Sequence, residues 1–135
     1  MKQQLKIMIA DDMQMMRRLL KASLMKAGFQ HISEAINGED LLKKLDEHTY
    51  DIVICDWDMP RMSGIDALRH IRSSEAHKDL PFVMVTAVSE AAQVKEAIAA
   101  GISDYIIKPI KPDQFVEKVK KILSQLELPV PVSVV

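Results

Sequence analysis

Five short apolar runs alternate with five longer amphipathic stretches along this chain, and this alternation most constrains how it can fold. The short runs are typical of strands, whereas the longer stretches carry apolar residues at helical spacing. Strands are expected over residues 5–10, 31–36, 50–56, 81–86 and 103–107, and helices over 13–27, 38–47, 64–73, 89–100 and from Lys111-Pro112 onward. Strands that alternate with helices predict an α/β fold in which helices cover both faces of a parallel sheet.

The third run, Tyr50 to Asp56, is apolar on both faces after Asp51. A strand that is apolar on both faces is typical of the centre of a parallel sheet. Right-handed crossovers and a central third strand favour the doubly wound, five-stranded order 2-1-3-4-5. The sequence therefore predicts a flavodoxin-like topology.

Each expected helix has recognisable ends and one apolar side. Asn37 and Ser89 are expected caps, and Gly28 and Gly101 are expected stops. The residues expected to face inward are Met16, Leu19, Leu20, Leu24 and Ala27, then Leu41, Leu42 and Leu45, then Ile65, Leu68 and Ile71, and in the last helix Phe115, Val119, Ile122 and Leu126. The first helix is expected to expose Arg17, Arg18, Lys21 and Lys26 on its other side.

Composition limits the class of protein. With 135 residues, 48% hydrophobic and 27% charged, the chain is long enough for one globular domain. We expect this domain at residues 1–128 and a flexible tail or linker at residues 129–135. The net charge of −1 gives no general attraction to nucleic acid, and no apolar run approaches the ~20 residues of a membrane span. The single cysteine, Cys55, is expected to be a core thiol in the reducing cytoplasm.

Acidic residues stand where two of the expected strands end. Asp11 and Asp12 follow the first strand, and Asp56 ends the third. In the predicted strand order these ends are neighbours, at the edge where such sheets bind ligands. Three crowded carboxylates raise one another's pKa unless a cation lies among them, and Mg²⁺ suits such oxygen ligands best.

Two further polar residues end the neighbouring strands: Thr86 ends the fourth strand, and Lys108 follows the fifth. A hydroxyl and an ammonium group at this edge can each contact a phosphoryl oxygen. The set therefore suits in-line phosphoryl transfer to Asp56, helped by a metal ion. Read singly, each residue has a plainer interpretation: Asp12 as a helix cap, Asp11 and Lys108 as loop residues, and Thr86 as a strand end.

Four motifs resemble the receiver domains of two-component response regulators, and among these the chemotaxis type most. They are Asp11-Asp12, the block from Asp56 to Gly64, the run from Val83 to Ala87, and Asp104-Tyr105-Ile106-Ile107-Lys108-Pro109. Together they place the resemblance over residues 6–126. It implies a signalling module that is phosphorylated by a histidine kinase and that dephosphorylates itself, rather than an enzyme acting on separate substrates.

The resemblance also implies a role for each site residue. Asp56 is the implied phosphoacceptor, and the implied ligands of Mg²⁺, or of Mn²⁺ in its place, are Asp12 and Asp56, Asp11 through water, and the backbone carbonyl of Asp58. Thr86, the Ala87 backbone and Lys108, which precedes a cis proline, are implied to contact the phosphoryl group. Thr86 and Tyr105 are implied to be the switch that remodels the partner surface on the fourth helix, fifth strand and fifth helix.

Two positions and one helix segment depart from the chemotaxis pattern. Asp58 stands where asparagine is expected, and Val88 stands where glutamate is expected. In the family these two side chains flank the path of the hydrolytic water, so the resemblance implies that they tune dephosphorylation. The helix after Ser89 reads Ala91-Ala92-Gln93 in place of two lysines that serve known partners, which weakens the transfer of those partners to this chain.

Other functions fit the sequence less well. A haloacid-dehalogenase-like phosphatase shares the Asp-x-Asp form of Asp56-Trp57-Asp58, but it carries that motif on its first strand. A flavodoxin-like carrier needs a hydroxyl-rich phosphate loop after the first strand, where Asp11-Asp12 would repel phosphate. Within the receiver interpretation, a stand-alone regulator and a receiver from a longer regulator both remain open, as do a monomer and a phosphorylation-dependent dimer.

Overall fold

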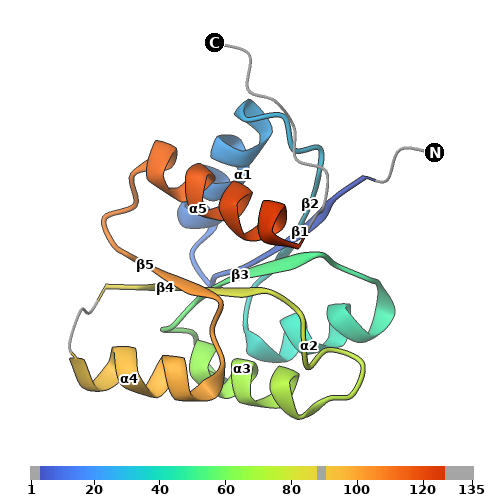
Figure 1. Cartoon of the computed structure of the whole chain (residues 1–135), viewed down its shortest axis with the longest axis vertical. Helices are drawn as coiled ribbons and strands as arrows, with labels where there is room; N and C mark the ends of the chain where they lie inside the picture. The colour runs from blue at the N-terminus through green and yellow to red at the C-terminus, as the bar shows by residue number, and fades with distance from the viewer. Residues whose placement is uncertain (1–3, 88–90, 127–135) are drawn as a thin grey trace.

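The structure is a computed structural model that describes residues 4–87 and 91–126. Strands and helices alternate along these residues, as the sequence predicts (Figure 1). The elements are β1 (Lys6–Ala10), α1 (Gln14–Lys26), β2 (His31–Ala35), α2 (Gly38–Glu47), β3 (Ile52–Asp56), α3 (Gly64–Ser73), β4 (Phe82–Thr86), α4 (Ala91–Ala100), β5 (Asp104–Ile107) and α5 (Pro112–Gln125). Several expected ends are wrong by one or two residues; β3, for example, begins at Ile52 rather than Tyr50. The expected Ser89 cap and the tail at 129–135 lie outside the described residues.

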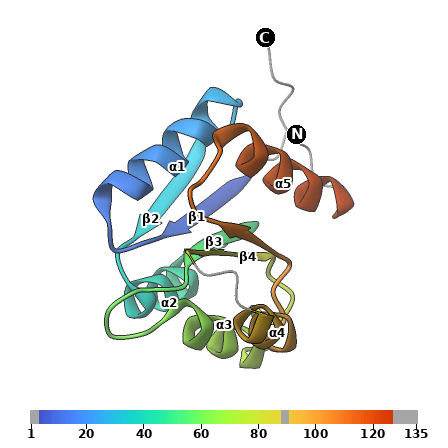
Figure 2. The ribbon, with the colours of Figure 1, turned by 90° about the vertical axis from the view of Figure 1, so that its left-hand side faces the viewer.

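The strands form one parallel sheet in the predicted order β2-β1-β3-β4-β5. Helices α1 and α5 cover one face, and α2, α3 and α4 cover the other, as the two views show (Figures 1 and 2). All five residues of β3 are buried, because this strand is central and has helices on both sides. The doubly wound architecture predicted from the sequence is confirmed.

Alternation along β3 divides the interior into two cores. Ile52 and Ile54 pack in the core beneath α1 and α5, whereas Val53 and Cys55 pack in the core beneath α2, α3 and α4. Burying each aliphatic side chain of this size contributes roughly 1.5–3 kcal/mol. Packing in both cores fixes β3 in position, and this fixes the backbone of Asp56 at the carboxyl end of the strand.

The helix ends largely follow the sequence signals. The Asn37 side chain accepts a hydrogen bond from the Asp40 backbone N–H at 2.8 Å, which makes Asn37 the cap of α2. Gly28 and Gly101 have φ values of 104° and 97° after α1 and α4, a conformation that favours glycine. Within the described residues, no helix is both long and apolar enough to cross a membrane.

Two residues expected in the core lie at the surface instead. Leu19 is 39% exposed and Leu126 is 48% exposed. Each has a leucine nearby in the chain that is buried in its place: Leu20 in α1 and Leu123 in α5. In α1 only one of the adjacent Leu19 and Leu20 can face the sheet. Leu126 is exposed because it is the C-cap of α5, where the helix ends.

Candidate functional site

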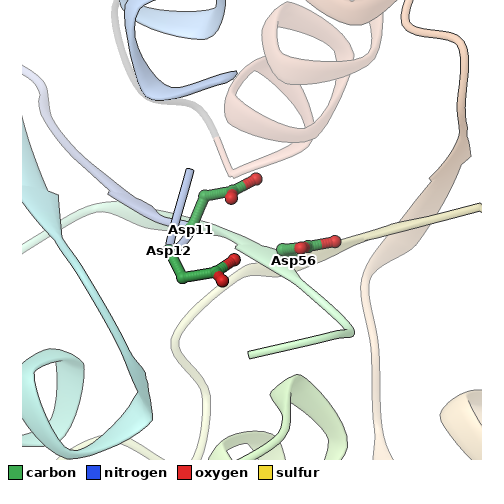
Figure 3. A group of neighbouring side chains, drawn as sticks. All are labelled: Asp11, Asp12 and Asp56. Atoms are coloured by element: carbon green, nitrogen blue, oxygen red, sulfur yellow. The ribbon is translucent and has the colours of Figure 1, made fainter. Parts of the chain in front are cut away.

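The carboxyl ends of β1 and β3 bring three aspartates together. Asp11, Asp12 and Asp56 each offer an oxygen atom, and these oxygens lie within 4.8 Å of one another (Figure 3). They meet because β1 and β3 are adjacent and parallel, with Ala10 opposite Cys55. Asp11 and Asp56 are buried, whereas Asp12 is exposed. The arrangement is a negatively charged, partly open site at the edge of the sheet.

The turn that carries the first two aspartates is held by its backbone. The Asp11 N–H donates to the Ala35 carbonyl at 3.1 Å, and the Asp11 carboxylate accepts from the Met13 N–H at 2.8 Å. Helix α1 has Met13 as its N-cap and no side-chain cap, so the alternative interpretation of Asp12 as a cap is wrong. The Asp12 carboxylate therefore does not cap α1 and lies with those of Asp11 and Asp56.

Lys108 reaches the cluster from the end of β5. Its Nζ lies 3.1 Å from Asp56 Oδ1, and its side chain is 21% exposed. The Lys108 N–H donates to the Thr86 carbonyl at 2.8 Å, and the Lys108–Pro109 peptide bond is cis, as the family resemblance implies. The Lys108 ammonium therefore offsets part of the negative charge of the cluster and lowers the pKa of Asp56.

Two carboxylate oxygens are buried in the site: Asp11 Oδ2 has no hydrogen-bond partner, and Asp56 Oδ1 has only the ion pair with Lys108. Leaving a buried acceptor unsatisfied costs ~1–3 kcal/mol, and more when the group is charged. A small divalent cation among these oxygens would remove that cost. The donor set is all oxygen, which is the chemistry that Mg²⁺ prefers, so the residues fit the ion.

Burial shapes the protonation of the two aspartates. It raises the pKa of Asp11 to about 6, against the lowering effect of the Met13 N–H and with a further rise from Asp56. Burial also raises the pKa of Asp56. The Lys108 ammonium lowers this pKa, and the negative charges of Asp58 and Asp12 raise it further. Both carboxylates are therefore costly to ionise unless positive charge is added.

In the absence of metal, the contribution of Asp11 to the free energy of unfolding is expected to fall as pH rises from about 4 to above 6. Below the unfolded pKa of about 4, Asp11 is protonated in both states and the penalty is absent. As pH passes the folded pKa of about 6, the native state must lose its extra proton, at a cost of up to ~3 kcal/mol from this residue. Urea titrations in EDTA at several pH values measure this, and Asp11→Asn should flatten the dependence. An unchanged pH dependence in that variant would contradict the assignment.

Thr86 and Tyr105 meet at a small cavity beside the acidic cluster. Thr86 is 5% exposed at the end of β4, and Tyr105 on β5 is half-buried. The cavity is lined by Trp57, Met84, Thr86, Gln93, Val94, Ala97 and Tyr105. The Thr86 and Tyr105 side chains therefore border the same cavity, so a movement of Thr86 changes the space available to the Tyr105 ring. Ala87 is exposed after β4, and Val88 lies outside the described residues.

Two residues near the site have a structural role that was not assigned to them from the sequence. Arg17 was expected at the surface, yet its side chain is only 13% exposed and donates to the Asp11 carbonyl at 2.8 Å. At Gly64, a Cβ atom would collide with the Asp56 carbonyl oxygen. The sequence signal for Gly64 was its place in the motif after Asp56; for Arg17 the sequence carried no signal of burial.

Comparison with known proteins gives consistent matches. The family model of the response regulator receiver domain matches residues 7–120. The chain is 40% identical over 122 residues to the chemotaxis protein CheY of Pseudomonas aeruginosa, covering 90% of this chain and 98% of that protein. It is 42% identical to chemotaxis protein CheY-3 of Vibrio cholerae, covering 90% and 94%.

Solved structures agree with the sequence matches. The chemotaxis response regulator CheY4 of Vibrio cholerae superposes with a TM-score of 0.84 at 25% identity, covering 90% of this chain and all of that one. A beryllofluoride-activated DrrB receiver domain has a TM-score of 0.80 at 27% identity, covering 90% and 99%. With an acidic cluster and a lysine at the carboxyl edge of a 2-1-3-4-5 sheet, the chain belongs to the response regulator receiver domain family, the phosphoacceptor regulators of two-component signalling.

Proposed function

We propose that Asp56 accepts a phosphoryl group from the phosphohistidine of a histidine kinase. The observation that carries this proposal is the position of Asp56: it ends a fully buried strand, 3.1 Å from Lys108 and beside two other carboxylates. A carboxylate held in this way is oriented as a nucleophile, and positioning supplies much of the catalysis in phosphoryl transfer. We place this receiver domain at residues 1–128.

The proposed metal is Mg²⁺, with Mn²⁺ as the alternative. Asp12 and Asp56 would bind it directly, Asp11 through water, and the Asp58 backbone carbonyl would complete the protein ligands. The buried Asp11 Oδ2, which has no hydrogen-bond partner, and the buried Asp56 Oδ1 beside it support this assignment. When bound, the ion supplies positive charge that offsets the charge of the phosphoryl oxygens.

The proposed transfer is catalysed by the chain itself. An Asp56 oxygen attacks phosphorus, an O–P bond forms as the N–P bond breaks, and the electron pair stays on the imidazole nitrogen of the donor. The Lys108 ammonium, the Thr86 hydroxyl and the Ala87 backbone N–H contact the phosphoryl oxygens. Attack of water on the aspartyl phosphate later releases inorganic phosphate and restores the Asp56 carboxylate.

The proposed output is a change in the surface formed by α4, β5 and α5. Thr86 moves toward the phosphoryl group, and Tyr105 turns into the space that they share, which shifts the population between two packings. Two apolar side chains already stand exposed on this surface: Ile98 at 61% and Ile107 at 40%. They suit a protein partner or, after phosphorylation, a second copy of this chain. From the relatives' names we extend the role to chemotaxis, in the cytoplasm.

The test is to incubate the protein with MgCl₂ and acetyl phosphate, a small phosphodonor that replaces the kinase. We expect a mass gain of one phosphoryl group and a change in Trp57 fluorescence, since Trp57 borders the cavity next to Asp56. When beryllofluoride is added, the largest changes in the NMR chemical shifts of backbone amides outside the site should lie on α4, β5 and α5. A protein that gains no phosphoryl group, with Mg²⁺ present and the fold intact, would contradict the proposal.

Asp58 is proposed to lengthen the life of the aspartyl phosphate. Its charge raises the pKa of Asp56, and a carboxylate of higher pKa is a poorer leaving group. Asp58→Asn is therefore expected to speed phosphate loss roughly two- to fivefold, the size of one screened charge interaction. The measurement is the decay of phosphorylated mass after the donor is removed. The double variant Asp58→Asn, Val88→Glu tests both positions, and a decay equal to that of the wild type would reject their tuning role.

A further inference from the structure

Arg17 is folded back from α1 onto the turn that carries the acidic residues. Its Nη1 donates to the Asp11 backbone carbonyl at 2.8 Å, while its Nε donates to Glu34 at 3.0 Å. Glu34 lies on β2, so one guanidinium group links the acidic turn to the edge of the sheet. Only 13% of the Arg17 side chain is exposed, so these contacts are largely shielded from water.

The Asp11 carbonyl belongs to the peptide unit that joins Asp11 to Asp12. Because this unit is planar, fixing the carbonyl also fixes the Asp12 nitrogen and Cα, and so limits the directions in which the Asp12 side chain can leave the backbone. Among the described residues, no hydrogen bond or ion pair holds the Asp12 carboxylate itself. The position of this carboxylate thus depends on how firmly its backbone is held.

We infer that Arg17 is a positioning residue for the metal site: it fixes the Asp11–Asp12 peptide and thereby the Asp12 carboxylate. The inference rests on the proposed Mg²⁺ site. Arginine suits this task because its planar fork donates in two directions at once, whereas a lysine ammonium is a single point on a flexible stem. Groups that orient ligands without touching the ion commonly contribute 10- to 100-fold to metal affinity.

The experiment is a Mg²⁺ titration of the full chain followed by Trp57 fluorescence, with melting temperatures in EDTA and in millimolar MgCl₂. Arg17→Met should raise the Kd for Mg²⁺ about tenfold or more, and shrink the rise in melting temperature that Mg²⁺ gives. Arg17→Lys should recover part of the affinity. The matched control is Lys21→Met: Lys21 also pairs with Glu34, at 3.6 Å, but does not contact Asp11, so its Kd should stay at the wild-type value.

An Arg17→Met protein that is folded and binds Mg²⁺ as the wild type does would overturn the inference. If Arg17→Met fails to fold, the Arg17→Lys titration decides: a wild-type Kd overturns the inference, and a raised Kd supports it. A loss of affinity equal in Lys21→Met and Arg17→Met would also overturn it, because the effect would then come from Glu34. Failure of the metal site itself is distinguishable, since the wild type would not respond to Mg²⁺ and Asp12→Asn would change nothing.

Discussion

The Asp56→Asn protein is expected to gain no phosphoryl group under conditions in which the wild type gains one. The substitution replaces the nucleophilic carboxylate by an amide of nearly the same shape, and an amide oxygen does not attack phosphorus at a useful rate. The cores around β3 remain filled, because Ile52, Val53, Ile54 and Cys55 are untouched. Since burial raises the pKa of Asp56, removing its charge should not lower stability in the absence of metal.

The matched control for this experiment is Asp58→Asn, the same chemical change two residues further along the chain. Asp58 is exposed, and only its backbone carbonyl is proposed to bind the metal, so this variant should still be phosphorylated. Intact mass after incubation with acetyl phosphate and MgCl₂ gives the readout, and a melting curve verifies the fold. A phosphoryl group on Asp56→Asn at the wild-type level would place the acceptor at another residue.

The strand order could be predicted because it depends on properties visible along the chain. An apolar run such as Ile52 to Cys55 can be buried on both faces only in the centre of a sheet, and right-handed crossovers then leave few arrangements. The meeting of Asp11, Asp12 and Asp56 follows from the same topology, because parallel strands bring their carboxyl ends to one edge. The roles assigned to these residues came from the family resemblance and remain predictions.

The predictions that were wrong concern residues whose burial depends on contacts between distant segments of the chain. Both Leu19 and Leu20 fit an apolar helical stripe, and only the placement of α1 on the sheet decides which of them is buried. Arg17 has the character of a surface residue, yet its side chain on α1 donates to the Asp11 carbonyl and to Glu34, which is 17 positions away on β2. Helical periodicity carries no information about such partners.

Gly64→Ala is expected to be the most destabilising single change near the site. Gly64 begins α3, and its N–H donates to the Trp57 carbonyl at 2.8 Å, which draws the helix start onto the end of β3. A Cβ here would overlap the Asp56 carbonyl oxygen and would lie 2.8 Å from Met84 Sδ and 3.0 Å from the Trp57 Cα. Two of these three neighbours are backbone atoms of the segment that bears Asp56, and they cannot rotate away.

We therefore expect Gly64→Ala to lose ~3 kcal/mol or more of unfolding free energy, at or beyond the upper end for overpacking. The comparison variant is Gly38→Ala, whose Cβ would come within 2.7–2.9 Å of Met62 atoms. Met62 lies in the loop before α3 rather than at the end of a central strand, so the loop can shift and the loss should be smaller. Urea unfolding of both variants in EDTA measures the difference. Because relief of the overlap must move the Asp56 backbone, the Gly64→Ala protein that remains folded should also bind Mg²⁺ more weakly. An unfolding free energy of Gly64→Ala within ~1 kcal/mol of the wild-type value would contradict the prediction, since it would show that the end of β3 shifts more easily than its packing indicates.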